Sequence, residues 1–504
     1  MKLKIENLTA EWKSGYELPK FDVPEMIART KAAPTWLHMG AGNIFRIFVA
    51  SAQQDLLESG QTDTGIIVYE AYDEEIIAKS FVPYDNLMLG VTLNADGSTK
   101  KRVIASVADA FSNDSERLAQ IIASPSLQLI SLTITEKGYT VTPETVCKDP
   151  AQAITTLEQI ALGLLRRFET GACPIALVSM DNFAENGSQL AKSITTIATA
   201  RRNDSFTEYV KSLKYPWTMI DNITPRPSES VAKILAAEGF EDTQITETVK
   251  HTFVAPFVNA EAAKYLIIED DFPNGRPSLE KAGVYMTNRE TVRKADQMKV
   301  CACLNPLHTI LAISGMLLNY PTISECMKDE RLVKFIRCAA NEAMTVVPHP
   351  GIIDPADFLN EVLTQRFPNP FIPDMPARIA SDTSQKIPIR FGVTLKERAK
   401  KGLPTADLKA IPLFIALWLR YRMGTDDSGM KMELSPDPNL PEALNILYGL
   451  PLGKSVELKP ILSNENLFGI NLYEAGLGEK IEKLFAKLSA GTNAVSDELN
   501  NLSV

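Results

Sequence analysis

Runs of apolar residues that end in polar or glycine-rich segments recur along the first half of the chain. Runs as short and continuous as these are typical of strands that are buried on both faces of a parallel sheet. Helical patterns lie between several of them, and the alternation predicts an α/β fold with a doubly wound, Rossmann-like sheet. The apolar runs occupy residues 35–39, 65–70, 102–107, 127–134, 174–179, 217–225 and 265–272, and the clearest helical patterns between them occupy 44–57 and 150–168.

From about residue 290 onward, helical patterns replace the strand signals. Thr322 with Glu325, and Asp354 with Pro355, are typical of helix N-termini. We therefore predict two domains: an α/β domain with an N-terminal extension over residues 1–288, and a mainly α-helical domain over residues 289–504. The predicted helices of the second domain are 306–318, 323–346, 355–366, 386–401, 405–424, 440–448 and 475–489.

Composition narrows the class of protein. The formal net charge is -10 and no basic block stands out, which argues against a nucleic-acid partner. The N-terminal residues lack the apolar core of a signal peptide, and no run of about 18 apolar residues is evident, so we expect no membrane span. The six cysteines form no Cys-x-x-Cys pair, so we expect a reduced, cytoplasmic protein without a metal site.

The first apolar run leads into a turn that contains Gly40 and Gly42. A strand, a glycine-rich turn and a helix together place a pyrophosphate at the helix N-terminus. Phe45 stands where the usual dinucleotide motif has a third glycine. The pattern therefore predicts a dinucleotide site, although two glycines also form ordinary tight turns.

The second apolar run ends at Glu70, where nucleotide-binding folds place the group that accepts hydrogen bonds from ribose hydroxyls. Asp73 is the reserve candidate, and a solvated strand end is the alternative. A carboxylate at this position favours NAD over NADP because it repels a 2′-phosphate. The polar segments 133–137 and 181–186 follow other predicted strands and are expected at the same edge of the sheet.

One stretch of the second domain contains groups suited to the interconversion of a carbonyl and an alcohol: Lys299, Asn305 and His308. A lysine can transfer the proton, an amide N–H can hold the oxygen, and an imidazole can orient the substrate. Lys299 and His308 would be about half a turn out of phase on one straight helix. The helix must therefore bend or start between them, and Pro306 gives a reason. The alternatives are that Asn305 caps a helix and that His308 is a core residue.

Taken together, these motifs resemble the mannitol dehydrogenase family, the polyol-specific long-chain dehydrogenases. The resemblance extends from about residue 34 to about residue 450. Two positions depart from the family pattern: Asn222 stands where an arginine is common, and Pro306 where a glycine is common. The motifs that carry it are segments 40–46, 131–139, 179–182, 219–223 and 268–277, the Lys299, Asn305 and His308 spacing, and Arg378 with segment 382–388.

The resemblance implies an NAD(P)-dependent, metal-independent oxidoreductase with a Rossmann-like domain and a helical substrate domain, and with substrate bound between the two. Lys299 matches the catalytic acid/base, Asn182 and Asn305 the pair that holds the substrate oxygen, and His308 a substrate-orienting residue. Asp296 matches a carboxylate that relays protons. The matching substrate-contacting positions are Asp221, Arg378 and Lys386, and the predicted cofactor-binding residues are Gly40, Gly42, Asn43, Ile44, Arg46, Glu70, Thr133 and Thr135.

The forms of segments 135–139 and 382–388 are closer to the sugar-acid branch than to the free-polyol branch. We therefore expect NAD-dependent interconversion of a keto-hexuronate and a hexonate, as in fructuronate and mannonate. The alternatives are mannitol 2-dehydrogenation, tagaturonate reduction and a non-catalytic sugar-acid sensor. The expected partner is a small sugar acid or polyol, and the expected assembly is a monomer or small homo-oligomer.

Overall fold

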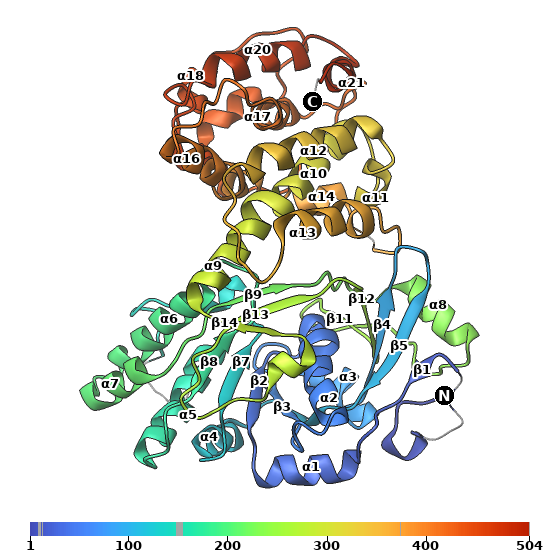
Figure 1. Ribbon diagram of the computed structural model, residues 1–504, viewed down its shortest axis with the longest axis vertical. Helices are drawn as coiled ribbons and strands as arrows, with labels where there is room; N and C mark the ends of the chain where they lie inside the picture. Colours follow the sequence, from blue (N-terminus) through green and yellow to red (C-terminus); the bar gives the residue numbers. More distant parts are fainter. Residues whose placement is uncertain (9–11, 13, 148–154, 373, 503–504) are drawn as a thin grey trace. The chain divides into compact units, whose positions relative to one another are not determined.

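The structure is a computed structural model that describes residues 1–8, 12, 14–147, 155–372 and 374–502. It divides into two compact units, Met1–Arg293 and Lys294–Val504. The division falls inside helix α9 (Arg289–Met298). Each unit is described by itself below (Figure 1).

The first unit contains a five-stranded parallel sheet with strand order β6-β3-β2-β7-β8. Strand β2 lies at its centre, with His38 paired to Val68 on one side and to Ser131 on the other. This is the predicted Rossmann-like sheet, so the predicted fold class is confirmed. Its strands are β2 (Trp36–Met39), β3 (Ile66–Tyr69), β6 (Val107–Phe111), β7 (Leu129–Leu132) and β8 (Ala176–Ser179).

Alternate residues of these strands enter two separate cores, because successive side chains of a strand point to opposite faces. Trp36 joins a core that also contains Phe48 and Val49, whereas Leu37 joins a core that contains Leu118 and Leu164. Both faces of the sheet are therefore covered (Figure 1). The first core is packed by η2 (Phe45–Val49) and α2 (Ala50–Glu58), and the second by α4 (Ser115–Ala123), α5 (Thr156–Glu169), α6 (Asn186–Ala200) and α7 (Asp204–Ser212).

The described residues of the first unit also form three smaller sheets. Their strand orders are β1-β5-β4-β12, β14-β13-β9 and β10-β11. The strands are β1 (Tyr16–Glu17), β4 (Met88–Leu93), β5 (Thr99–Ile104), β9 (Thr218–Asp221), β10 (Thr246–Glu247), β11 (Phe253–Val254), β12 (Phe257–Glu261), β13 (Tyr265–Glu269) and β14 (Tyr285–Thr287). The remaining helical segments are η1 (Ile5–Asn7), α1 (Val23–Ala32), α3 (Glu74–Ser80), η3 (Val82–Tyr84), η4 (Glu136–Tyr139), α8 (Glu229–Ala237) and η6 (Leu279–Ala282).

The single strand predicted over residues 102–107 is wrong. The chain leaves β5 after Ile104 and enters a different sheet with β6 at Val107. The amide oxygen of Gln54 accepts the N–H of Ala105, and the Ser106 hydroxyl donates to the carbonyl of Ala50. These buried bonds satisfy polar groups of Ala105 and Ser106, the two residues that link β5 to β6. Apolar patterning does not reveal such a change of sheet. Part of the helix predicted over 150–168 lies outside the described residues.

The second unit is mainly helical, as predicted, and the fully buried helix α17 (Ala410–Tyr421) lies in its core. Thr322 and Asp354 accept backbone N–H bonds as helix caps, also as predicted. The helix predicted over 323–346 is two helices, because Asp329 caps the second. The other elements are η7 (Lys299–Cys303), α10 (Asn305–Leu317), α11 (Ile323–Cys326), α12 (Glu330–Met344), α13 (Pro355–Glu361), η8 (Val362–Arg366), α14 (Pro376–Ala380), α15 (Thr383–Ile387), η9 (Pro388–Gly392), α16 (Val393–Lys400), η10 (Glu442–Leu447), α18 (Lys459–Leu462), α19 (Glu465–Phe468), α20 (Gly478–Leu488) and α21 (Ala494–Asn500).

The helical run Arg289–Leu317 is 29 residues long and is apolar enough to cross a membrane by length and composition alone. This run was not predicted from the sequence. Its most apolar window is 78% buried within the protein. That degree of burial is typical of a core helix, which passes the same test of length and composition.

Candidate active site

The turn after β2 is built around Gly40, which has a φ of +104°. A Cβ at this position would lie 2.4 Å from the carbonyl oxygen of Thr133, so only glycine fits. At Gly42 a Cβ would meet no heavy atom of the described residues within 4 Å. The predicted strand, glycine turn and helix are therefore present. Open space beside Gly42 at the start of a helix suits a phosphate group.

His38 joins the two strands that lead into this edge of the sheet, and the sequence analysis did not single it out. Its Nδ1 lies 2.6 Å from the Ser131 hydroxyl and its Nε2 lies 2.9 Å from the Thr133 hydroxyl. The ring also stacks on Phe45 with centroids 4.0 Å apart. Burial lowers the pKa of His38 to about 3, so the imidazole is neutral near pH 7. His38 therefore links β2 to Ser131 and Thr133.

Glu70 lies at the end of β3 and is only 7% exposed. Its carboxylate accepts the N–H of Ala41 at 2.8 Å, of Tyr72 at 2.8 Å and of Asp73 at 3.1 Å. It thus ties the glycine turn to the segment after β3. The reserve candidate, Asp73, accepts a bond of 2.7 Å from the Thr248 hydroxyl. The ribose contact of Glu70 stays a prediction, and these backbone bonds would share the carboxylate with it.

A cavity of about 400 Å³ lies beside this strand end. It is open to the ends of β3 and β6, where an adenosine group is expected in a Rossmann-like fold. Three carboxylates and one ammonium group line it. The lining residues are Ala71, Tyr72, Asp73, Glu74, Glu75, Asn113, Val249 and Lys250.

The cofactor contact predicted for Arg46 stays a prediction, and the structure gives its side chain a partner in the protein. Its side chain is 0% exposed, and its guanidinium donates to the carbonyl of Ala255 at 2.8 Å. Burial lowers the pKa of Arg46 to about 9. Arg46 therefore lies on the inward face of its helix. Of its neighbours in the predicted set, Asn43 donates to the carbonyl of Pro225 at 3.2 Å and Ile44 packs against the core.

Asp181 organises the ends of β7 and β8. Its carboxylate accepts the N–H of Ile134 at 2.9 Å, the N–H of Thr135 at 3.0 Å and the hydroxyl of Tyr139 at 2.6 Å. Burial raises the pKa of Asp181 although these bonds lower it. Thr135 has a φ of 64°, which is uncommon for a β-branched residue, and the bonds of Asp181 hold it there. Asn182 follows directly and is exposed.

Asp221 lies at the end of β9, in the three-stranded sheet β14-β13-β9, and is 7% exposed. The predicted polar segments after β2, β3, β7 and β8 all lie at the carboxyl ends of parallel neighbours, as expected from the pattern of strands. Asp221 belongs to a different sheet, so this topology does not bear on its role.

In the second unit, the helix that carries Lys299 is interrupted before it reaches His308. Residues Lys299–Cys303 form a π-helical turn, and Leu304 departs from helical geometry with φ −132° and ψ −65°. The predicted interruption is therefore confirmed. Asn305 is the first residue of α10 and Leu304 is its N-cap, so the alternative that Asn305 caps the helix is wrong. Lys299 is 1% exposed.

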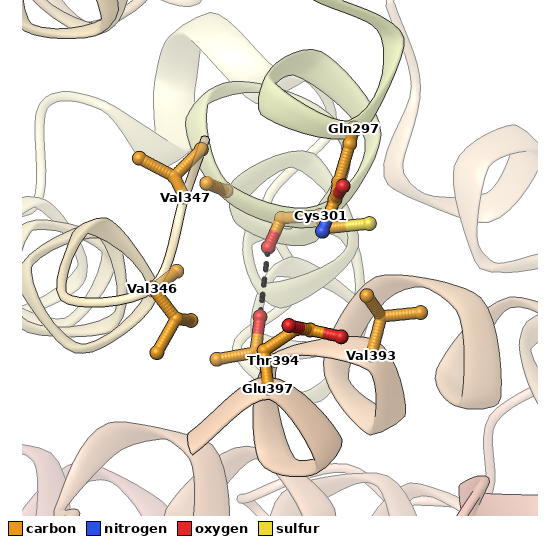
Figure 2. Close-up of a pocket in the computed structure, with 9 residues that line it drawn as sticks. Gln297, Cys301, Val346, Val347, Val393, Thr394 and Glu397 are labelled. Atoms are coloured by element: carbon orange, nitrogen blue, oxygen red, sulfur yellow. Dashed lines mark hydrogen bonds between the residues drawn. The ribbon is translucent and has the colours of Figure 1, made fainter. Parts of the chain in front are cut away.

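Side chains from a distant segment satisfy the backbone of this break. In a π-helix the carbonyl of residue i accepts from residue i+5, and for Cys301 that residue is Pro306, which has no N–H. The Thr394 hydroxyl donates to the Cys301 carbonyl instead, at 3.1 Å (Figure 2). The Cys301 thiol donates to the carbonyl of Ile389, and Arg390 donates to the carbonyl of Asn305 at 3.1 Å. None of these contacts was predicted.

Figure 2 shows a small cavity between this turn and the segment that contains Thr394. Its volume is about 10 Å³, the space of roughly one water molecule. Burial raises the pKa of Cys301 to about 12, so its sulfur is a neutral thiol near pH 7. The cavity therefore lies beside an unreactive cysteine and is too small for a substrate.

His308 and Arg378 both contact the carboxylate of Asp374. Its Nε2 lies 2.6 Å from the Asp374 carboxylate, with the N–H not aligned for a hydrogen bond. Arg378 contacts the other oxygen of the same carboxylate at 2.5 Å. Burial raises the pKa of Asp374, but His308 and Arg378 outweigh it, so the pKa is lowered overall. Asp374 thus fixes the imidazole, and no sequence signal distinguished it.

Two further residues of the predicted set have altered acidity. Burial, followed by the charge of Arg390, lowers the pKa of Lys386 to about 8. Lys386 donates to the carbonyls of Ile379 and Ser381, at 2.9 Å and 2.5 Å. Burial raises the pKa of Asp296 and the charge of Lys299 opposes it, with the pKa raised overall. In the second unit, the charge of Lys299 therefore acts on Asp296. The charge of Arg390 acts on Lys386, and Arg390 also donates a hydrogen bond to the carbonyl of Asn305.

Known proteins match the chain along nearly its whole length. A model of the mannitol dehydrogenase Rossmann domain matches residues 34–281, and one of the mannitol dehydrogenase C-terminal domain matches residues 291–489. The D-mannonate oxidoreductase of Thermotoga maritima is 48% identical over all of this chain and 99% of its own. The mannitol 2-dehydrogenase of Cereibacter sphaeroides is 28% identical over 82% of this chain and 85% of its own.

Solved structures agree with these matches. The ternary complex of Pseudomonas fluorescens mannitol 2-dehydrogenase with NAD and D-mannitol has a TM-score of 0.77 at 25% identity, and covers 99% of each chain. A substrate-free D-sorbitol dehydrogenase has a TM-score of 0.81 at 22% identity, covers 98% of this chain and all of its own, and shows the fold. The Rossmann sheet, the helical second unit and the two family models together establish that the chain belongs to the mannitol dehydrogenase family of oxidoreductases.

Proposed function

We propose that this protein is an NAD-dependent oxidoreductase that interconverts a keto-hexuronate and a hexonate, namely fructuronate and D-mannonate. The observation that carries the proposal is the 48% identity to a D-mannonate oxidoreductase over essentially the full length of both chains. Two mannitol 2-dehydrogenases, from Cereibacter sphaeroides and Emericella nidulans, are 28% identical to the chain.

The glycine turn of the first unit fits a dinucleotide. Open space beside Gly42 lies at the start of a helix, and a cavity of about 400 Å³ adjoins the end of β3. Bound NAD(H) supplies the hydride acceptor or donor. The carboxylates of Asp73, Glu74 and Glu75 line the cavity with a single ammonium group, that of Lys250. This surplus of negative charge favours NAD over NADP, because it repels a 2′-phosphate.

Lys299 is the proposed acid/base for the substrate hydroxyl. Burial of its side chain to 1% exposure keeps bulk water from competing for the proton. Asp296 is the proposed relay, because its raised pKa allows it to take up and release a proton closer to neutral pH. The amides of Asn305 and Asn182 are proposed to donate to the substrate oxygen, where negative charge develops during hydride transfer.

His308 is the proposed substrate-orienting group, and its contact with Asp374 supports this role because it fixes the ring. Arg378 and Lys386 are proposed to contact the sugar chain. Asp221, buried at the end of β9, stays a weaker candidate for substrate contact. The proposed cofactor contacts of Thr133 and Thr135 are supported by their place at the end of β7, beside the glycine turn.

Mannitol 2-dehydrogenation is the second candidate function, because several relatives and one solved structure carry that name. Tagaturonate reduction and a non-catalytic sugar-acid sensor are the remaining alternatives. A sensor would not require a buried lysine two turns before an amide and an imidazole, and the chain retains all three.

The direct experiment is to mix the protein with NAD and D-mannonate, follow NADH formation by absorbance, and identify the keto product by chromatography. Parallel reactions contain D-mannitol or the hexonate that corresponds to tagaturonate. We expect fructuronate from D-mannonate at the highest rate. Oxidation of D-mannitol alone would establish the second candidate instead, and binding of sugar acids without any NADH formation would establish the sensor.

A further inference from the structure

Arg390 lies in the π-helical turn η9 (Pro388–Gly392), four residues after Lys386. Its Nη1 donates to the carbonyl of Asn305 at 3.1 Å and contacts the hydroxyl of Thr309. Both partners lie in the first two turns of α10, and Asn305 also carries the proposed oxygen-binding amide. Arg390 therefore binds the backbone of Asn305, the residue whose side-chain amide is proposed to hold the substrate oxygen.

The charge of Arg390 is not balanced within the protein. Arg378 pairs with Asp374 at 2.5 Å and Arg398 pairs with Asp407 at 2.8 Å, both in the same unit. Among the described residues, no carboxylate pairs with Arg390. Arg390 is partly buried, and a partly desolvated cation without a counter-ion is less stable than one that binds an anion from outside.

The neighbourhood of Arg390 adds to this positive charge. Burial lowers the pKa of Arg390 to about 10, and its charge helps to lower the pKa of Lys386. Asp382 and Asp437 raise the pKa of Lys386, and Arg378 lowers it. Asp437 also accepts the N–H and hydroxyl of Ser384, so its oxygens are already engaged. The site therefore favours an anionic ligand.

The geometry of the guanidinium leaves one edge for that ligand. Nη1 holds Asn305 and Thr309, whereas no described residue accepts a hydrogen bond from Nε or Nη2. These two N–H groups lie side by side on the same edge of the guanidinium plane. That edge matches the two oxygens of a carboxylate, which arginine binds in parallel with two hydrogen bonds.

We propose that Arg390 binds the carboxylate of the substrate and thereby selects sugar acids over free polyols. The inference rests on the proposed function, because it assumes that the substrate chain lies beside Asn305. One guanidinium would then serve two purposes: Nη1 holds the backbone of Asn305, and the Nε and Nη2 edge holds the carboxylate. A polyol has a hydroxymethyl group in place of the carboxylate and leaves this cation unpaired.

The test is calorimetric titration of D-mannonate into the complex of the full-length protein with NADH, for the wild type and for Arg390→Met. The substitution removes the charge and keeps a side chain of similar length. We expect the affinity for D-mannonate to fall about 10- to 100-fold, as for the loss of charge-assisted hydrogen bonds. The affinity for NADH is expected to stay within about twofold. A D-mannonate affinity within about twofold of the wild type, in a folded Arg390→Met protein, overturns the proposal.

Thr309→Val separates carboxylate recognition from the support of Asn305. It removes one partner of Nη1 but keeps the guanidinium charge, so D-mannonate should bind within about threefold of the wild type. If Thr309→Val weakens binding as much as Arg390→Met does, Arg390 only supports Asn305 and the proposal is wrong. Catalytic efficiency adds a second readout: Arg390→Met should reduce kcat/KM for fructuronate more than for fructose, whereas a supporting role reduces both equally.

Arg390→Lys covers the case in which Arg390→Met does not fold. Lysine keeps the charge but lacks the paired N–H edge, so we expect about tenfold weaker D-mannonate binding with NADH binding unchanged. Unchanged D-mannonate binding contradicts the proposal. Failure of the proposed function is a different result: a wild-type protein that reduces fructose and not fructuronate. A wild type that reduces fructuronate, with variants that bind D-mannonate normally, rejects only the role of Arg390.

Discussion

The glycine turn after β2 and the helix break after α9 both depend on a residue that lacks an ordinary group. Gly40 lacks a Cβ, which would lie 2.4 Å from the Thr133 carbonyl oxygen. Pro306 lacks the N–H that would satisfy the carbonyl of Cys301. The two sites differ in what supports them. Neighbouring parallel strands hold the glycine turn, whereas Thr394 and Arg390, from a segment more than 80 residues away in the sequence, hold the break.

This difference separates two kinds of site. The position of the glycine turn follows from the order of strands, since carboxyl ends of parallel strands meet at one edge. The position of Lys299 relative to Asn305 follows from individual side chain to backbone bonds. The first kind of site should tolerate changes in its surroundings, and the second should respond to the loss of single hydroxyl or guanidinium groups.

The largest effect is expected for Lys299→Ala. If Lys299 transfers the hydroxyl proton, turnover should fall by about 10²- to 10⁴-fold, the range for loss of a general acid/base. The glycine turn lies in the other unit, so fluorescence titration should show NADH affinity within about twofold of the wild type. Loss of NADH binding together with turnover would mean that Lys299 has a structural role.

A matched pair of substitutions separates the structural role of Gly40 from the proposed phosphate-binding role of Gly42. Gly40→Ala combines positive φ with a contact of 2.4 Å, so it should destabilise the protein by about 2–6 kcal/mol. Gly42→Ala has space for its Cβ and should leave the thermal midpoint nearly unchanged, but the methyl group enters the proposed phosphate site and should weaken NADH binding. If the Gly42→Ala protein binds NADH as tightly as the wild type does, the cofactor phosphates do not lie beside Gly42.

Thr394→Val tests the support of the helix break. It removes the donor to the buried Cys301 carbonyl, so denaturant unfolding should show a loss of about 1–3 kcal/mol. Turnover should also fall, because the register of Lys299 against Asn305 depends on this turn. Thr364→Val is the control, since the exposed Thr364 hydroxyl bonds only to the carbonyl one turn earlier. Equal effects of the two substitutions would remove the special role of Thr394.

The smallest effect is expected from the titration of Lys386, whose pKa is lowered to about 8. Its ammonium group is charged below that pH and neutral above it, so its attraction for a carboxylate is present below about pH 8 and lost above it. The KM for fructuronate should therefore rise severalfold between pH 7 and pH 9, and the KM for fructose should not. A parallel rise for both substrates would show that the charge of Lys386 does not attract the carboxylate.

The sequence predicted the Rossmann sheet, the glycine turn and the interruption between Lys299 and His308, because each depends on local patterning or on a single glycine or proline. It did not predict the change of sheet at Ala105, since a run of apolar residues is the same in either sheet. The burial of the Arg46 side chain also could not be predicted, because the position of Arg46 directly after the turn does not show which face of the helix it occupies.

Other parts of the site could not be predicted from the sequence, because their contacts join residues far apart in the chain. Asp374 and Arg390 act through partners far away in the chain, and no spacing rule connects them with His308 or Asn305. The role of Asp181 could have been predicted, because a carboxylate at the end of a buried strand commonly accepts nearby backbone N–H groups. The roles of the predicted catalytic residues stay predictions until they are measured.

The central claim is that a sugar acid is the substrate, and one comparison tests it directly. The wild-type protein is supplied with NADH and with fructuronate or fructose in the same buffer at pH 7, and kcat/KM is measured for each ketose. We predict that kcat/KM for fructuronate exceeds that for fructose by at least about tenfold, as expected for one recognised carboxylate. An equal or higher kcat/KM for fructose would contradict the claim.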